Sequence, residues 1–199
     1  PADTVAVSGD VKLRGVTHGG ETVYANLFVS LDTPEVDFTA QPANSYLANK
    51  PGALYRIDVS RNLAGEKFNV ASLGVIWQPS TNFVKYLTLE EDGTATFFLS
   101  ADTEDESLVR EGNALIGAYD EAGNILWSWH IWAVNYDAEA EALAYGDYTM
   151  MSRALGQLEN VTTDKESILA SYGLYYQWGR KDPFPGPSTY NAAKGVTMS

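Results

Sequence analysis

The sequence predicts a mainly β protein, an antiparallel Ig-like β-sandwich followed by an irregular, short-helical C-terminal extension. Short segments rich in β-branched and aromatic residues recur along the chain. Turn residues separate them at a spacing of roughly 8–12 residues, which is typical of a sandwich. Hydrophobic residues make up 45% of the 199 residues and aromatic residues 12%, so the chain can bury a substantial core.

Strands are expected where apolar and polar side chains alternate, or where β-branched and aromatic residues concentrate. Tyr55, Ile57 and Val59, for example, alternate with polar residues and would share one buried face. The segments expected to be strands are 4–7, 11–14, 22–31, 43–48, 54–59, 74–78, 83–89, 94–99, 113–119 and 124–134.

Turns and loops are expected between these strands. Pro-Gly at 51–52, Asp-Gly at 92–93 and Asp-Glu-Ala-Gly at 120–123 carry the residues that tight turns require. The stretch 32–41 is polar and contains a proline, so we expect a connection there. The acidic stretch 102–107 is expected to be a solvated loop.

The character of the sequence changes after residue 137. The segment 138–144 is rich in Ala and Glu, which favours a helical turn or a linker, and 167–173 is also expected to be helical. Three prolines make 182–187 irregular. We therefore expect a sandwich domain at 1–137 and an extension at 138–199, with the extension resembling part of a further domain.

Charge and composition exclude several classes of protein. The formal net charge is −13, without a cluster of Lys and Arg, so we expect no nucleic-acid partner. The chain has no cysteine, which excludes disulfides and thiol catalysis. No apolar run approaches the roughly 20 residues of a membrane-spanning helix, so no membrane-spanning segment is expected.

The densest aromatic feature is the strand segment Trp-Ser-Trp-His-Ile-Trp at 127–132. Tryptophan on both faces indicates that something outside the sandwich covers one of them. Two interpretations remain open for the outer face: packing beneath a neighbouring segment, or a platform that stacks on a sugar or a partner, with Trp132 as a ligand-binding residue. The two faces are Trp127, Trp129 and Ile131 on one side, and Ser128, His130 and Trp132 on the other.

Catalytic and metal motifs are weak in this sequence. His18 and His130 are its only histidines, and it has no Gly-x-Ser-x-Gly elbow, metal-spaced His pair or phosphate-binding Gly loop. The acidic stretch 102–106 lacks the alternation and the glycine of a Ca²⁺-binding EF-hand loop. We expect no enzymatic activity, no catalytic residue and no cofactor.

A second aromatic concentration lies at 172–185. Tyr and Trp beside Arg are typical of a recognition surface, although a rigid structural loop braced by proline would have the same composition. The candidate ligand-binding residues here are Tyr175, Tyr176, Trp178 and Arg180.

Parts of the chain resemble a known family. The segments 43–52, 112–120 and 125–132 resemble a β-sandwich domain of fimbrillin-like surface lipoproteins of Bacteroidetes-type bacteria. The segments 151–156 and 173–184 resemble the start of a major-paralogous, C-type-lectin-like domain that often follows it.

The resemblance implies an exported protein at the bacterial cell surface, anchored to the outer membrane or fimbrial. It implies non-enzymatic adhesion or a structural role related to a pilus, with other surface or pilus subunits as partners. The alternative is a glycan-binding module of a polysaccharide-capture system, with host or dietary glycans as ligands.

Overall fold

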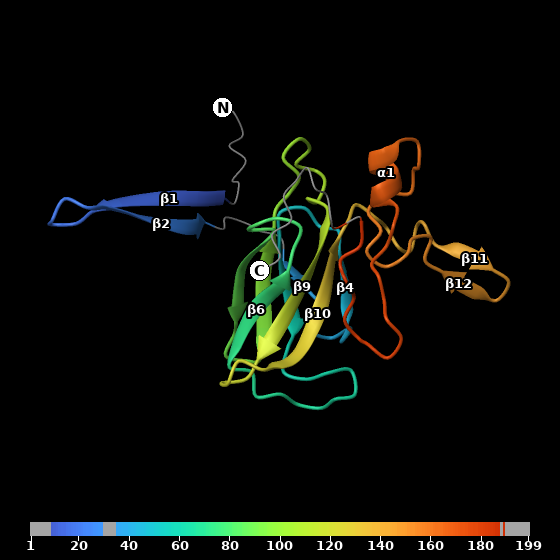
Figure 1. Cartoon of the computed structure of the whole chain (residues 1–199), viewed down its shortest axis with the longest axis horizontal. Coiled ribbons are helices and arrows are strands. Elements are labelled where there is room, and N and C mark those ends of the chain that lie inside the picture. The colour runs from blue at the N-terminus through green and yellow to red at the C-terminus, as the bar shows by residue number, and fades with distance from the viewer. Residues whose placement is uncertain (1–8, 30–34, 188, 190–199) are drawn as a thin grey trace.

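The computed structural model describes residues 9–29, 35–187 and 189, and its centre is a sandwich of two four-stranded sheets (Figure 1). The expected strand at 4–7 lies outside the described residues. One sheet has the order β4 (Ser45–Ala48), β10 (Ile125–Ala133), β9 (Gly112–Tyr119) and β6 (Ser72–Trp77). The other has the order β3 (Glu35–Asp37), β5 (Ala53–Asp58), β8 (Thr94–Leu99) and β7 (Val84–Leu89). The mainly β prediction is confirmed.

Most neighbours in these sheets run antiparallel, and each sheet has one parallel edge strand. β4 pairs parallel to β10, and β3 pairs parallel to β5. The stretch 32–41 was expected to be only a connection. Its described part instead contains β3, which forms because its backbone groups find partners on β5, a pairing that local propensity does not reveal.

The core lies between the two sheets and follows the alternation of their strands. Tyr55, Ile57 and Val59 are all buried there, as predicted. On β9 and β10, Ile116 and Trp129 are among the side chains that face them. Fully burying an aliphatic or aromatic side chain of this size stabilises the fold by about 1.5–3 kcal/mol, so this core is the main source of stability.

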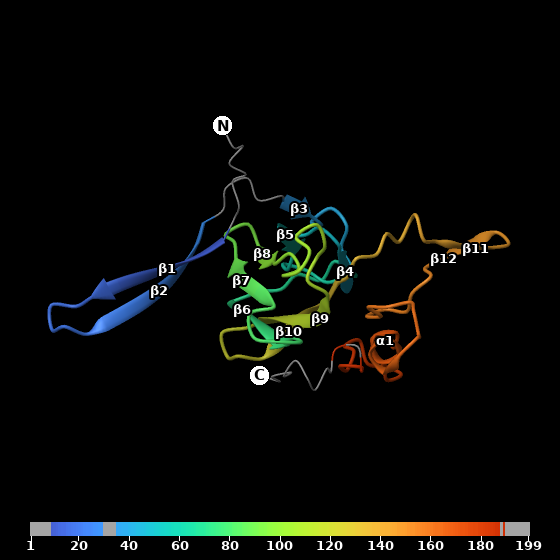
Figure 2. The same ribbon diagram turned by 90° about the horizontal axis from the view of Figure 1, so that it is seen from above.

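Two hairpins project from opposite sides of the sandwich (Figure 2). The first consists of β1 (Gly9–Val16) and β2 (Thr22–Val29), and the second of β11 (Leu143–Tyr145) and β12 (Tyr148–Met150). The second hairpin corrects the expectation of a helical turn or linker at 138–144. Gly146, with φ of 61°, begins a two-residue turn, and this local turn chemistry outweighs the helical preference of Ala and Glu.

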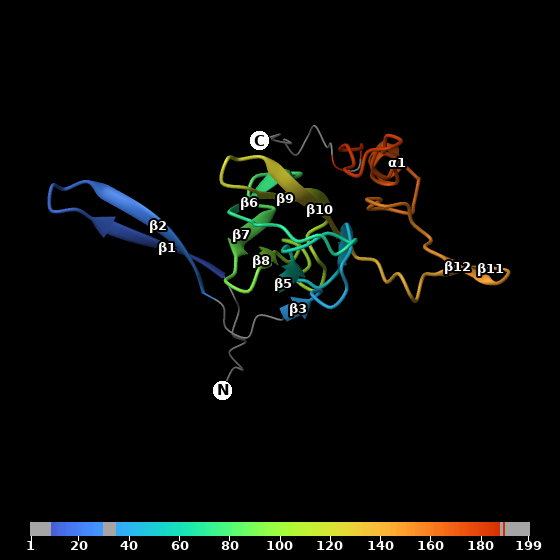
Figure 3. The ribbon, with the colours of Figure 1, turned by 90° about the horizontal axis from the view of Figure 1, so that it is seen from below.

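The C-terminal segment after β12 contains one short helix, α1 (Lys165–Ala170), close to the helix expected at 167–173. Asp164 caps it, because its carboxylate accepts from the backbone N–H of Ser167. Other parts of the segment contact the outer side of the β4-β10-β9-β6 sheet, which is the side away from the core (Figure 3). No helix among the described residues is long and apolar enough to cross a membrane.

Candidate functional site

The outer face of β10 is buried beneath the C-terminal segment. Ser128, His130 and Trp132 point away from the sandwich core, yet each is almost inaccessible to solvent. This confirms the interpretation that the outer face packs beneath a neighbouring segment. The covering chain places Gln157 over Trp132, and Lys181 over Ser128. We call this contact the docking face.

A chain of hydrogen bonds runs through the docking face. The amide nitrogen of Asn113 donates to the carbonyl oxygen of Gly156 (2.8 Å), which can only accept. Asn113 Oδ1 therefore faces His130 Nε2 at 3.0 Å, and this nitrogen must donate. Burial keeps the ring neutral, so His130 Nδ1 lacks a proton and accepts from the hydroxyl of Ser45 at 2.7 Å. The network fixes a neutral imidazole in one tautomer.

The order of these contacts is that of a nucleophile, a base and an orienting group, but the imidazole is a poor base. Burial lowers the pKa of His130 from 6.5 to about 3. The group at Nε2 is the neutral amide of Asn113, and not a carboxylate that would stabilise an imidazolium. These hydrogen bonds therefore join β4, β9 and the C-terminal segment. A proton transferred from Ser45 to His130 would be held unfavourably.

The lowered pKa makes stability depend on pH from about 7 down to about 3, and the upper part of this range, from pH 7 to pH 5, lies above the ordinary pKa of aspartate. The unfolded chain protonates His130 near pH 6.5 and the folded chain does not, so stability falls as the pH falls through this window. We expect a loss of about 2 kcal/mol in the free energy of unfolding between pH 7 and pH 5. Urea unfolding of the intact chain beside His130→Gln, which cannot titrate, measures this loss.

The range from pH 7 to pH 5 separates His130 from the carboxyl groups. Hydrogen bonds from neighbouring side chains and backbone N–H groups hold the pKa of Asp92 and Asp120 below the ordinary 3.8, so these groups keep their charge above pH 5. An equal loss in His130→Gln would contradict the assignment to this imidazole.

Trp132 is a structural residue of the docking face. Its indole N–H donates to the carbonyl oxygen of Gln157 (3.1 Å), and its ring packs 5.7 Å from that of Tyr136. The guanidinium of Arg153 lies over the Tyr136 ring, 4.8 Å from its centre. Only 1% of Trp132 is exposed. Its expected role as a ligand-binding residue does not fit this structure, because the C-terminal segment covers the ring.

The other candidate residues lie together on one loop, residues 175–184, which we call the aromatic loop. Its ends are joined, because Tyr175 and Phe184 exchange both backbone hydrogen bonds at 3.1 and 2.8 Å. Just before it, Leu174 is buried against Trp77 and Leu115 of the sheet. The loop therefore begins from a fixed base on the sandwich.

Lys181 and Asp182 attach the loop a second time, to β10. Lys181 Nζ donates to Ser128 O at 2.8 Å and lies 4.7 Å from the centre of the Trp127 ring. It also pairs with the carboxylate of Asp182, which accepts from the Ser128 hydroxyl at 2.5 Å. These contacts attach the loop to β10, and the residues at its tip remain exposed to solvent.

The aromatic loop presents the predicted residues to solvent. Trp178 is 102% exposed, and Tyr175 and Tyr176 are each about half exposed. Arg180 is exposed and stacks its guanidinium 4.2 Å over the Phe184 ring. The turn closes through Arg180 N–H to Gln177 O at 3.0 Å. The fold thus brings these residues together and separates them from Trp132.

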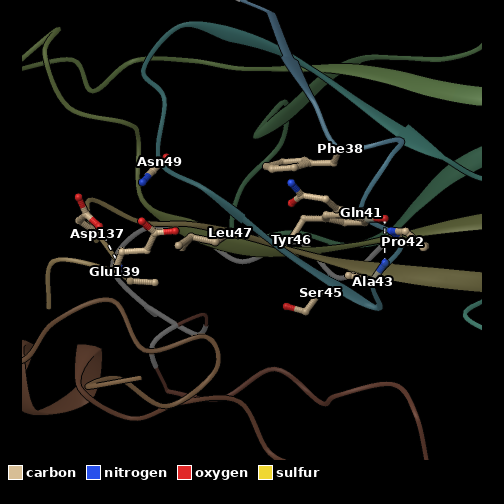
Figure 4. Close-up of a pocket in the computed structure, with 11 residues that line it drawn as sticks. Phe38, Gln41, Pro42, Ala43, Ser45, Tyr46, Leu47, Asn49, Asp137 and Glu139 are labelled. Atoms are coloured by element: carbon tan, nitrogen blue, oxygen red, sulfur yellow. Dashed lines mark hydrogen bonds between the residues drawn. The ribbon is translucent and has the colours of Figure 1, made fainter. Parts of the chain in front are cut away.

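Sequence reasoning missed a hollow of about 490 Å³ beside the open edge of β4 (Figure 4). Polar groups line it, among them Gln41, Asn49 and Glu139, with Phe38 and Tyr46 as its aromatic residues. No local motif signals it, because it forms only where the parallel pairing of β4 with β10 leaves the other edge of β4 open.

The acidic stretch 102–107 forms local turns. Asp102 Oδ1 accepts from the backbone N–H of Glu104 (2.8 Å), and Asp105 Oδ1 accepts from Ser107 N–H (2.9 Å). Hydrogen bonds from the hydroxyl and the backbone N–H of Ser107 hold the pKa of Asp105 below its ordinary value. In the part of the chain that the structure describes, no three His, Asp or Glu side chains are grouped so as to hold a metal ion.

Comparisons with known proteins do not identify the chain. No family model, curated protein or solved structure that was compared with the chain matches it.

Proposed function

We propose that this chain is a non-enzymatic module of an exported bacterial cell-surface protein and that it acts by contact, in adhesion or as a structural part of a fimbria. The aromatic loop is its contact surface, and other surface or pilus subunits are its partners. The single observation that carries the proposal is the complete exposure of Trp178 on a loop that is otherwise firmly attached to the sandwich.

Complete exposure of a tryptophan side chain favours a role in binding a ligand or partner. A large aromatic side chain is ordinarily among the more buried residues, and Trp, Tyr and Arg are the residues that dominate the binding energy of interfaces. Because both ends of the loop are fixed, covering Trp178 costs less backbone entropy than it would on an unattached loop.

The chemistry of the docking face also supports a role without catalysis. His130 is buried in a neutral tautomer between Ser45 and Asn113, and its pKa is about 3. Such an imidazole holds segments together and is unsuited to proton transfer at neutral pH. The resemblance to fimbrillin-like surface lipoproteins supports the same class of function.

A glycan-binding module of a polysaccharide-capture system is the second candidate. The proximity of Tyr175, Tyr176 and Trp178 on the aromatic loop favours it, because aromatic rings stack on the apolar faces of pyranose sugars. In this case host or dietary glycans would be the ligands.

One binding experiment tests the proposal and separates the two candidates. The labelled chain is applied to printed arrays of host and plant glycans and to arrays of matrix and bacterial surface proteins. Retention on proteins alone supports adhesion or structural contact, whereas selective retention on glycans supports the second candidate. If the folded chain is retained on neither, a contact function for the aromatic loop is contradicted.

A further inference from the structure

The hollow beside the open edge of β4, which we call the β4 hollow, has walls that hydrogen bonds hold in place. It lies between the turn at 38–41, before β4, and the turn at 137–141, after β10 (Figure 4). In the first turn, the backbone N–H of Gln41 donates to Phe38 O at 2.9 Å. In the second, Asp137 Oδ1 accepts from the backbone N–H of Glu139 at 3.0 Å. The amide nitrogen of Asn49 donates to a backbone carbonyl group just before this turn, also at 3.0 Å. The shape of the hollow is therefore preformed.

The β4 hollow contains polar groups that the protein leaves available. In the part of the chain that the structure describes, the side-chain amide of Gln41 and the carboxylate of Glu139 have no hydrogen-bond partner, and both side chains are exposed. Asn49 uses its amide nitrogen in the wall, which leaves its amide oxygen. Ala48 bonds to β10 through its carbonyl group, so the N–H and C=O of the preceding residue, Leu47, point toward the open edge.

The lining of the β4 hollow disfavours two classes of ligand. Asp137 and Glu139 line it, and none of its described lining residues is Lys or Arg. Lys50 follows Asn49 but does not line the hollow. A phosphate or carboxylate ligand would therefore be repelled. A wholly apolar ligand would cover the available amide and carboxylate groups without replacing their hydrogen bonds to water.

A neutral, hydroxyl-rich ligand matches this lining. A hydroxyl group both donates and accepts, and the hollow offers acceptors on Asn49 and Glu139 beside donors on Gln41 and Leu47. Phe38 adds apolar surface against which the C–H groups of a sugar ring can pack. The volume of about 490 Å³ lies within the range of small-molecule sites, roughly 300–1,000 Å³. A sugar residue combines the hydroxyl groups and the apolar C–H face that these side chains would contact.

We propose that the β4 hollow is a binding site for a neutral sugar residue. The site goes beyond the proposed function, because none of its described lining residues belongs to the aromatic loop. It also differs from the glycan-binding alternative for that loop, in which exposed aromatic rings make the contact. Here the hydroxyl groups of one sugar residue bind to amide and carboxylate groups at the edge of the sandwich.

Titration of the ¹⁵N-labelled intact chain with uncharged sugars tests the site. The probes are the methyl glycosides of glucose, galactose, mannose, xylose, fucose and N-acetylglucosamine, and the readout is the backbone amide signal of each residue. At least one probe should shift the signals of Leu47, Asn49 and Glu139 in a saturable way. The signals of the aromatic loop should stay in place. If none of the six probes causes saturable shifts at these three residues, the proposal is overturned.

Two single substitutions test the groups that would bind the sugar. Gln41→Ala and Glu139→Ala remove exposed side chains, so unfolding should be unchanged. Each should weaken binding of the probe about tenfold, since a hydrogen bond to a sugar hydroxyl is lost. Glu121→Ala is the matched control, because it removes an exposed glutamate from the turn between β9 and β10. Binding by both variants as tight as by this control would contradict the proposal.

Two further comparisons decide where the sugar binds and which charge the site accepts. Trp178→Ala should bind the probe like the intact chain, and loss of the shift at Leu47 in this variant would contradict a site at the β4 hollow. Positively charged glucosamine and putrescine are titrated as well. Saturable shifts with these amines but with no neutral sugar would make the hollow a cation site and overturn the proposal.

The double variant Gln41→Ala/Glu139→Ala keeps the two binding surfaces apart on the glycan arrays. Its aromatic loop is intact, since neither residue belongs to that loop. Retention on glycans that persists in the double variant is due to the aromatic loop. Retention that disappears is due to the β4 hollow, so failure of this proposal and failure of the proposed function give different results.

Discussion

Trp132→Ala should lower the free energy of unfolding by about 3–5 kcal/mol, the range for removing a buried tryptophan. The ring fills the space between β10 and the C-terminal segment, and its N–H bond to Gln157 is lost with it. The carbonyl group of Gln157 would be left without this partner in a covered position, which adds to the cavity term. Urea unfolding followed by tryptophan fluorescence and circular dichroism measures the change.

Trp178→Ala is the matched control for this substitution. It removes the same side chain from a position that is 102% exposed, so the free energy of unfolding should change by less than about 0.5 kcal/mol. Equal losses in the two variants would contradict the placement of Trp132 beneath the C-terminal segment. A loss confined to Trp132→Ala would support this placement.

Gly156→Ala should lower the free energy of unfolding by about 2–5 kcal/mol. Gly156 has φ of 83°, which costs an alanine about 1–2 kcal/mol, and an added Cβ would lie only 2.4 Å from Leu174 Cγ. Relief of this overlap requires Leu174 to move away from Trp77 and Leu115, and such overpacking costs about 1–3 kcal/mol. The carbonyl group that accepts from Asn113 would move too.

Gly123→Ala separates the two contributions. Gly123 has nearly the same φ, 82°, but nothing lies within 4 Å of its added Cβ. This variant should show only the backbone cost of about 1–2 kcal/mol. If Gly156→Ala were no more destabilising than Gly123→Ala in thermal or urea unfolding, the close contact between the C-terminal segment and the sheet would be contradicted.

Much of the sandwich could be predicted because its signals are local. Segment 94–99 was expected as a strand with the bounds of β8, and the alternation at Tyr55, Ile57 and Val59 predicted which face is buried. Tryptophan on both faces of 127–132 indicated correctly that a further segment covers the outer face. These features depend on periodicity and burial, which a single sequence displays.

The remaining features depend on contacts between distant residues. β3 is a strand because β5 lies beside it, and its own residues, Glu35–Asp37, are mostly charged. The hairpin after residue 142 was hidden by the helical preference of Ala and Glu, although Gly146-Asp147 is a readable turn signal. Trp132 and Trp178 could not be told apart by sequence, since only tertiary packing buries one and exposes the other.

The most direct test of the account is the adhesion of the Trp178→Ala variant beside the intact chain. Beads coated with either protein are passed in a flow cell over the surface on which the arrays show the strongest retention. We expect adhesion of the variant to fall at least tenfold while its unfolding is unchanged, because the exposed ring is the centre of the contact surface. Undiminished adhesion of the folded variant would contradict the claim that this protein acts through the aromatic loop.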